Sequence, residues 1–211
     1  MLRRALERVL EFPAVYDLNQ LIGQATVRRY ARLIAEEVPL SAETSVLDIG
    51  CGTGSTRRVV VGRYCGIDIN PNYIAAAKRN HPGGDFIHMD GTRLTFADDC
   101  FDQAISIATT HHLDDRQLEA MTSEALRVLR TAGTFHIIDA ILPLNPRERA
   151  KEMFFRMDRG RHPRGLDELI RVVSRAASVI RKRVLTGPLH DVAYLRIAPS
   201  EGAGRTESPT E

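Results

Sequence analysis

The sequence predicts an α/β fold with a doubly wound, mostly parallel β-sheet. Short apolar runs alternate with segments of helical periodicity almost to the C-terminus, which is typical of a parallel sheet with helices on both faces. The 211 residues, 43% hydrophobic and 27% charged, have the size and composition of one globular domain. A glycine-rich turn follows the first apolar run, at the edge where such sheets bind ligands.

Five apolar runs are expected to form parallel strands, and two further runs an antiparallel hairpin. The hairpin runs, residues 183–186 and 192–198, flank Gly187-Pro188. A helix is predicted from residue 166 to about residue 181, before the hairpin. The parallel strands are predicted at residues 45–49, 64–69, 86–89, 103–108 and 135–140.

Two helices between the strands carry clear end signals. Asn70 and Pro71 stand where a cap and the first helical residue are expected, and this helix is predicted to stop near Asn80. The second helix has Asp114 or Asp115 as its cap. Its buried stripe is predicted to consist of Leu118, Met121, Ala125 and Val128.

The main domain is expected at residues 41–198. Residues 1–40 show helical periodicity and predict an N-terminal helical segment that acts as a lid. Residues 143–164, rich in arginine and proline, are interpreted as an insertion over the ligand-binding edge, and residues 199–211 are expected to be a disordered tail. The candidate lid residues are Tyr16, Gln20 and Tyr30, although aromatic residues at helical spacing more often belong to a core.

Composition and charge exclude several classes of protein. The 29 basic and 27 acidic residues leave a net charge of +2, far from the excess usual in nucleic-acid-binding chains. No apolar run is long enough to span a bilayer. The cysteines Cys51, Cys65 and Cys100 are odd in number and form no C-x-x-C pair, which argues against a disulfide framework or a zinc site and predicts a cytoplasmic protein without a metal.

The strongest local signal is the run VLDIGCGTG at residues 46–54, a buried strand entering closely spaced glycines. Glycine allows a sharp turn and a close approach of the backbone to a ligand, although glycines also mark ordinary turns. Asp68, 18 residues after Gly50, ends the second strand where doubly wound folds hold a ribose. Asp90 ends the third strand, where a carboxylate can accept a hydrogen bond from the adenine amine.

With these features the chain resembles the small, single-domain class I S-adenosylmethionine-dependent methyltransferases. The resemblance covers about residues 46–140 and rests on LDIGCGTG, GIDIN, FIHMDG, CFDQAIS leading into TTHHL, and EALRVLRTAG. It implies a seven-stranded, Rossmann-like methyltransferase sheet with a reversed terminal strand. The chain departs from the family in its short 55–62 loop and in Thr131-Ala132-Gly133, which replaces a Pro-Gly-Gly type of turn.

The resemblance also implies the residues that bind the S-adenosylmethionine cofactor. Asp68 would hold the ribose, Asp90 with Gly91 would lie near the adenine, and Ile69 would pack on the adenine face. Thr109 would close the site towards the substrate. The residues that would line the methionine part are Asp48, Gly50, Gly52 and Gly54.

A nicotinamide dinucleotide is the rival cofactor. Its G-x-G-x-x-G fingerprint requires a third glycine three positions after the second. Ser55 occupies that position and Gly54 comes one residue too early, which favours the sulfonium cofactor over an NAD-dependent oxidoreductase.

Three groups are candidates for the reaction itself. His111 and His112 follow the fourth strand and are the first candidates for a catalytic base, with shaping of the cofactor site or capping of the next helix as the alternative. Asp139, near the end of the fifth strand, either faces the same cleft as a substrate residue or anchors a loop. Methyl transfer is an in-line displacement, so alignment matters more than a base.

Substrate class is narrowed mainly by what is missing. Residues 109–112 read TTHH rather than the N/D-P-P-Y/F turn of adenine and glutamine methyltransferases, and no cysteine stands where a cytosine C5 enzyme needs its nucleophile. Residues 145–183 hold twelve basic and five acidic side chains, either a solvated helix face or the rim of a pocket for an acidic small molecule. A nucleic-acid substrate is not expected, because the aromatic residues of this segment, Phe154 and Phe155, stand together and do not interleave the basic ones. The rim candidates are Arg159, Arg161, His162 and Arg164.

A small-molecule methyltransferase is therefore the expected function. The alternative from another class is a cofactor-binding partner protein without turnover.

Overall fold

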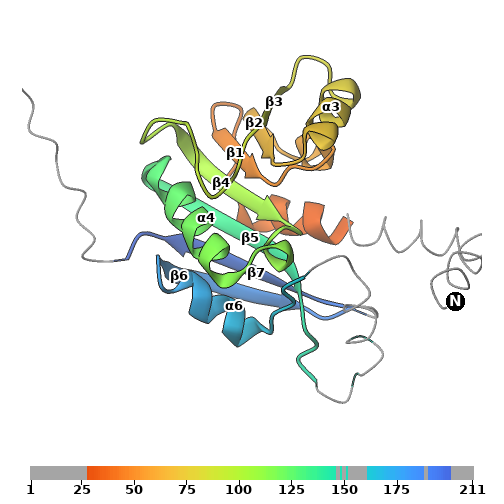
Figure 1. The fold of residues 1–211 in the computed structure, drawn as a ribbon, viewed down its shortest axis with the longest axis vertical. Helices are drawn as coiled ribbons and strands as arrows, with labels where there is room; N and C mark the ends of the chain where they lie inside the picture. Colours follow the sequence, from red (N-terminus) through yellow and green to blue (C-terminus); the bar gives the residue numbers. More distant parts are fainter. Residues whose placement is uncertain (1–27, 146–147, 149–150, 152–160, 188–189, 201–211) are drawn as a thin grey trace, which may run out of the picture.

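The computed structural model describes residues 28–145, 148, 151, 161–187 and 190–200, and these form one seven-stranded sheet (Figure 1). The strand order is β3-β2-β1-β4-β5-β7-β6. The strands are β1 (Ser45–Ile49), β2 (Arg63–Asp68), β3 (Asp85–His88), β4 (Phe101–Ile107), β5 (Leu129–Ile141), β6 (Ser178–Leu185) and β7 (Asp191–Ala198).

The pairing within the sheet confirms the predicted fold class. Strands β1 to β5 pair in parallel, whereas β7 runs antiparallel between β5 and β6. The chain winds outward from β1 to β3 and then returns to β4 on the other side of β1. Ligands of open α/β sheets bind at the carboxyl ends of the strands where the order reverses in this way.

Helices cover both faces of the sheet. Helices α4 (Asp115–Arg127) and α6 (Leu166–Val173) pack on one face, side by side in Figure 1. Helix α3 (Pro71–Asn80) and the helix of residues 28–37 contribute to the core on the other face. Successive strand residues alternate between the two cores, as Ile137 and Ile138 do in β5.

The predicted helix starts agree with the structure. The Asn70 side chain accepts a hydrogen bond from the Asn72 amide, and Pro71 is the first residue of α3. Asp114 is the cap of α4, and it exchanges hydrogen bonds with Gln117 in a capping box. The short loop after β1 holds only a 3-10 turn, η1 (Ser55–Arg58).

Three predicted boundaries in the C-terminal half were wrong. The helix expected over residues 166–181 ends at Val173, and β6 begins at Ser178, five residues before the predicted hairpin strand. Pairing with β7, beginning at Ser178 opposite Ala198, outweighs the local helical pattern. Strand β5 begins at Leu129 rather than near residue 135, and the register with β4 shifts there.

The predicted division of the chain is only partly within the described residues. The helix of residues 28–37 packs on the sheet through Leu33 and Ile34. Tyr16 and Gln20 lie outside the described residues, as do residues 201–211 of the expected tail and most of the expected insertion.

His136 lies in the core, and its titration affects stability. Its Nδ1 lies 2.9 Å from the Tyr194 hydroxyl, and its Nε2 lies 2.9 Å from Gln103 Oε1. Burial, with a smaller effect from Arg196, lowers the pKa of His136 from 6.5 to about 3. The unfolded chain therefore binds a proton below pH 6.5 that the folded protein does not take up until about pH 3.

We expect the free energy of unfolding to decrease as the pH falls from 6.5 towards 3, by up to about 1.4 kcal/mol per pH unit from this group. In His136→Asn that contribution is absent, so the difference between the two curves shrinks as the pH falls. Denaturant unfolding at several pH values measures it. Tyr194→Phe, which loses a partner of His136 but keeps the titrating ring, is the control and should retain the wild-type slope.

Candidate functional site

A cleft of about 720 Å³ lies at the carboxyl ends of β1, β2 and β4. This is the point where the strand order reverses, so the fold itself positions the cleft. Its described lining residues are Tyr30, Ile49, Gly50, Cys51, Gly52, Thr53, Ser55, Thr56, Asp68, Ile69, Asn70, Tyr73, Met89, Asp90, Gly91, Thr92, Ile107, Ala108, Thr109, His112, Leu113, Gln117 and Met121.

The glycine loop turns the chain away from β1 and forms one wall. Gly50, Gly52 and Gly54 all have positive φ, at 81°, 55° and 83°, a region that side chains other than glycine rarely adopt. A Cβ on Gly50 would collide with the Thr109 side chain, 2.4 Å away. A Cβ on Gly52 would meet no atom within 4 Å. The loop is therefore packed tightly at Gly50 and open to the cleft at Gly52.

The Asp68 carboxylate is fixed at the end of β2 by two backbone amides. Oδ2 accepts a hydrogen bond from Gly52 N at 2.9 Å, and Oδ1 accepts one from Asn70 N at 2.8 Å. Each carboxylate oxygen has a further lone pair, so Asp68 can still accept hydrogen bonds from a ligand. Its neighbour Ile69 is 66% exposed and lines the cleft, which is unusual for a large apolar side chain.

The third strand contributes a second carboxylate to the cleft. Asp90 Oδ1 accepts hydrogen bonds from the amide and the hydroxyl of Thr92, both at 2.8 Å. A Cβ on Gly91 would lie 2.6 Å from Ile49 Cγ2, so the chain after β3 passes close to the end of β1. The structure thus brings Asp68, Ile69, Asp90 and Gly91 to one cleft, together with the glycine loop.

Gly54 does not line the cleft, although it belongs to the predicted cofactor set. Asp48 does not line the cleft either, in contrast to the other residues of that set. Its side chain is 1% exposed, and Oδ2 accepts a hydrogen bond of 2.6 Å from the Tyr64 hydroxyl. Its Oδ1 forms no hydrogen bond within the described part of the chain. Burial raises the pKa of Asp48 from 3.8 to about 6, although the bond from Tyr64 acts in the opposite direction.

The two candidate histidines lie on a 3-10 turn, η2 (Thr110–His112), directly after β4, but only His112 lines the cleft. His111 is buried, and its Nδ1 lies 2.7 Å from Asp139 Oδ1. The two imidazole rings are in contact, with centroids 4.2 Å apart and planes tilted by 45°. Thr109 precedes the turn and packs against Gly50, so the turn also adjoins the glycine loop.

Asp139 lies at 0% exposure behind this turn. Burial alone would raise the pKa of this carboxyl, but hydrogen bonds from His111 and Thr110 outweigh it and lower the pKa. Asp139 is therefore an ionised, internally bonded carboxylate, and it is not among the residues that line the cleft.

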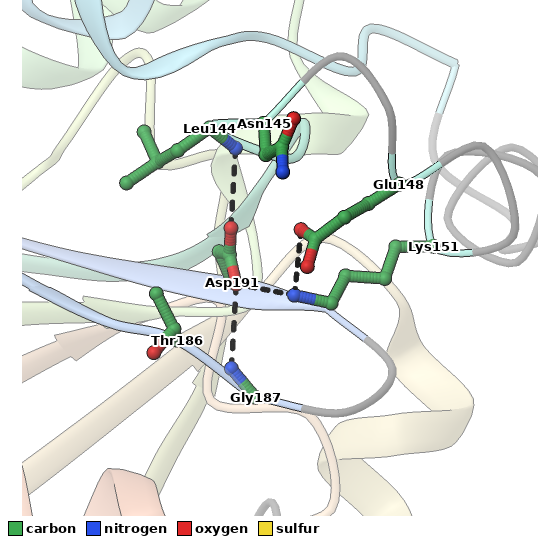
Figure 2. A pocket seen from close by; sticks show the side chains of 7 residues that line it. All are labelled: Leu144, Asn145, Glu148, Lys151, Thr186, Gly187 and Asp191. Atoms are coloured by element: carbon green, nitrogen blue, oxygen red, sulfur yellow. Dashed lines mark hydrogen bonds and ion pairs between the residues drawn. The ribbon is translucent and has the colours of Figure 1, made fainter.

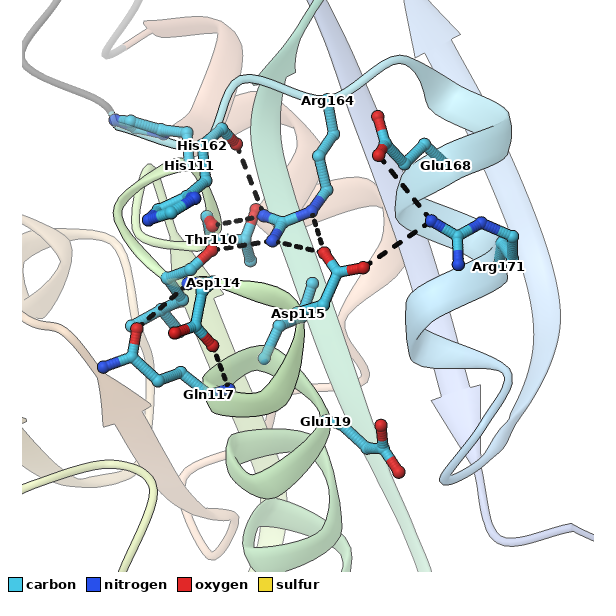
Figure 3. A network of polar contacts seen from close by, with 12 residues as sticks. Thr110, His111, Asp114, Asp115, Gln117, Glu119, His162, Arg164, Glu168 and Arg171 are labelled. Atoms are coloured by element: carbon cyan, nitrogen blue, oxygen red, sulfur yellow. Dashed lines mark hydrogen bonds and ion pairs between the residues drawn. The ribbon is translucent and has the colours of Figure 1, made fainter.

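The basic candidates after β5 are not gathered in the cleft. Arg164 is 6% exposed and donates hydrogen bonds to Thr110 O, Leu113 O and Asp115 Oδ1 at 3.0, 2.7 and 2.8 Å (Figure 3). Arg161 is exposed, and the His162 amide donates to His111 O at 2.9 Å. Arg159 lies outside the described residues.

A second cavity of about 440 Å³ lies beside the start of β7 (Figure 2). Its main polar contacts are internal: Lys151 Nζ lies 2.8 Å from Glu148 Oε2 and 3.3 Å from Asp191 Oδ1. Asp191 also accepts hydrogen bonds from the amides of Leu144 and Gly187. These contacts attach the segment after β5 to the β6–β7 connection.

Sequence reasoning missed several residues that line the main cleft. Tyr73 occupies the first turn of α3, and Gln117 and Met121 lie on α4. Tyr73 follows Asp68 by five residues, so its place near the end of β2 could have been inferred from the Asn70 cap. Gln117 and Met121 come from the helix after β4, and only the packing of α4 brings them there.

Within the part of the chain that the structure describes, no cluster of three or more acidic, histidine or cysteine side chains could hold a metal ion. Among the same residues no helix is long and apolar enough to cross a membrane.

Comparisons with known proteins agree with this geometry. Residues 46–133 match the model of a methyltransferase domain family. The chain is 28% identical over 136 residues to a demethylmenaquinone methyltransferase of Paenarthrobacter aurescens, covering 62% of this chain and 53% of that protein. It is 28% identical over 129 residues to a sterol 24-C-methyltransferase of Saccharomyces cerevisiae, covering 56% and 33%. The matches thus span about a third to a half of these two relatives.

Solved structures share the fold at low sequence identity. A protein of Pyrococcus horikoshii OT3 superposes with a TM-score of 0.70 at 19% identity, covering 92% of this chain and 99% of that one. A geranyl diphosphate C-methyltransferase of Streptomyces coelicolor, solved with Mg²⁺, geranyl diphosphate and S-adenosyl-L-homocysteine, superposes at 0.64 with 13% identity, covering 82% and 80%.

The buried Asp48 leads to a prediction about stability. Because its pKa is raised in the folded state, the folded protein binds more protons than the unfolded chain between pH 3.8 and about 6, and the cost of ionisation persists above that range. The free energy of unfolding of Asp48→Asn, measured by denaturant unfolding, should therefore exceed that of the wild type at pH 8 by about 1–3 kcal/mol. The variant should lose this advantage near pH 4. Equal stabilities at pH 8 would contradict the assigned burial cost.

Proposed function

We propose that the chain is a class I S-adenosylmethionine-dependent methyltransferase and that it transfers the cofactor's methyl group to a small-molecule acceptor. The match of residues 46–133 to a methyltransferase domain family supports this proposal. The observation that carries the proposal is the cleft at the reversal point of the sheet, with the Asp68 carboxylate held between Gly52 N and Asn70 N. These two bonds orient the acceptor lone pairs before a ligand arrives.

The residues of the cleft fit the cofactor in shape and charge. The open space at Gly52 leaves the loop backbone accessible to the methionine part, and exposed Ile69 offers an apolar face to the adenine. Asp68 would accept the ribose hydroxyls, with Asp90 and Gly91 near the adenine edge. The described lining residues include these two acidic side chains and no lysine or arginine, which favours a cationic sulfonium.

The bound cofactor supplies an electrophilic methyl group, and the chain supplies alignment. An in-line displacement requires the acceptor atom to lie about 3 Å from the methyl carbon on the side opposite the sulfur. Thr109 would separate the cofactor from the acceptor, and His112 would take a proton from an acceptor that carries one. His111 is behind His112 and would act through it.

The acceptor would enter beside Tyr30, Ile107 and Leu113, which give that part of the lining an apolar character. The names of two relatives, demethylmenaquinone and sterol methyltransferases, support an organic small molecule. An acidic acceptor is a second candidate, recognised by Arg161, His162 and Arg159. Arg164 is not offered for this role, because its donors are used within the protein.

Cofactor binding is tested by calorimetric titration with S-adenosylhomocysteine. We expect micromolar affinity, and a loss of about 1–3 kcal/mol in Asp68→Ala because hydrogen bonds to the ribose disappear. The matched control is Asp85→Ala. Asp85 begins β3, at the end of the strand away from the cleft, so this variant should bind S-adenosylhomocysteine as the wild type does. Absence of binding, or a preference for NADH, would reject the assignment.

A pair of glycine variants separates backbone strain from loss of the ligand. Gly52 and Gly83 both have positive φ, and a Cβ would meet no atom within 4 Å at either position. Alanine should therefore cost about 1–2 kcal/mol of stability at each. Only Gly52→Ala should weaken S-adenosylhomocysteine, by about tenfold or more, or 1.4 kcal/mol. Equal affinities in the two variants would show that the ligand does not approach Gly52.

Turnover is tested by incubating the protein with methyl-labelled S-adenosylmethionine and a panel of phenols, amines, quinols and carboxylated or phosphorylated metabolites. Transfer of label to a panel member identifies the acceptor class. Tight cofactor binding without transfer to any of them would favour a cofactor-binding partner protein.

A further inference from the structure

We propose that Asp139 and Arg164 are positioning residues. Both form hydrogen bonds with the η2 turn, from opposite sides, and so hold His112 in its place in the cleft. The proposal rests on the proposed function, because it gives His112 its orientation towards the acceptor. It also replaces the expectation that these two side chains contact the substrate.

Asp139, on β5, holds the turn by accepting hydrogen bonds from it. Its Oδ2 accepts hydrogen bonds from Thr110 N at 2.7 Å, from the Thr110 hydroxyl, and from His111 N at 3.3 Å. Its Oδ1 lies 2.7 Å from His111 Nδ1 and also accepts a bond from Ala140 N. A buried carboxylate is costly unless such donors surround it, so displacing the turn would expose an uncompensated charge.

Arg164 holds the same turn from the other side, by donating hydrogen bonds to its carbonyl groups. Its Nη1 donates to Thr110 O and its Nη2 to Leu113 O, so it binds carbonyls within and just after the turn. Asp115 at the start of α4 accepts two further bonds from the guanidinium and fixes its plane (Figure 3). Arginine suits this role because its planar group can bind several acceptors at once.

Thr110 forms hydrogen bonds with both residues. Its amide and hydroxyl are held by Asp139, and its carbonyl is held by Arg164. The neighbouring carbonyl of His111 accepts a bond from His162 N, which comes from the same segment as Arg164. The turn is thus fixed through main-chain groups that are independent of any ligand.

Asp139 influences the position of His112 through the ring of His111. An ionised carboxylate can only accept, so Asp139 assigns the proton of His111 to Nδ1 and fixes the plane of that ring. The His112 ring contacts the His111 ring at a tilt of 45°, with the centroids 4.2 Å apart. Since a misplacement of about 1 Å can cost about a hundredfold in rate, a loosened turn should lower kcat more than cofactor affinity.

The charged and titratable groups around η2 come from three elements. They are Asp139 on β5, His162 and Arg164 in the segment before α6, and Asp114 and Asp115 at the start of α4. Variants that leave all of these charges in place therefore give the cleanest test.

Thr110→Val and Thr110→Ser form such a pair. Valine removes the hydroxyl that Asp139 binds, whereas serine keeps it. ¹⁵N spectra of the histidine rings should show the Nδ1-protonated form of His111 in the wild type and in Thr110→Ser. In Thr110→Val the His112 ring signals should shift or broaden, and S-adenosylhomocysteine affinity should stay within about twofold of the wild type.

Arg164→Lys tests the hydrogen bonds between Arg164 and the turn. Arg171→Lys is its control, because Arg171 also contacts Asp115 but does not reach the turn. His112 signals should change in Arg164→Lys alone. With an acceptor from the panel, kcat should fall about tenfold or more in Thr110→Val and Arg164→Lys, with KM for S-adenosylmethionine nearly unchanged.

Unchanged His112 signals, or an unchanged kcat, in both Thr110→Val and Arg164→Lys would overturn the positioning role. That result differs from a failure of the proposed function, which would appear as absent S-adenosylhomocysteine binding in the wild type.

Discussion

The hydrogen bond from the Gly52 amide to the Asp68 carboxylate links the two strand ends that create the cleft. It joins the loop after β1 to the end of β2, and the amides of Gly50 and Cys51 add bonds to Ile67 O nearby. The chain can make these contacts only because the glycines accept positive φ. Both the shape of the cleft and the orientation of its main acceptor group depend on this short stretch.

The opposite wall is fixed in a different way. There the chain after β4 has no glycine framework, and side chains from distant parts of the sequence hold the η2 turn. Asp139 lies 29 residues after Thr110 in the sequence, and Arg164 lies 54 residues after Thr110. One wall is thus determined by local backbone conformation and the other by long-range polar contacts.

This difference explains which parts of the site could be predicted from the sequence. The glycine loop and the caps of α3 and α4 follow from rules that act within a few residues, and the structure agrees with them. The place of Asp68 at the end of β2 follows from its spacing to Gly50 in a doubly wound fold. The partners of Asp139 and Arg164 depend on how β5 and the segment after it fold back onto η2. The β6 boundary failed for the same reason, since pairing with β7 is long-range and overrides a local helical pattern.

Two buried aspartates show how the same residue type takes different roles in this fold. Asp48 accepts one short hydrogen bond, from Tyr64, and burial raises its pKa to about 6. Asp139 is equally buried but is surrounded by donors from Thr110 and His111, and its pKa is lowered. Burial therefore does not by itself set the pKa of a carboxylate, because hydrogen-bond donors around it act in the opposite direction. A charge retained at Asp139 keeps the η2 turn closed on β5, whereas Asp48 beneath the glycine loop takes up a proton once the pH falls below about 6.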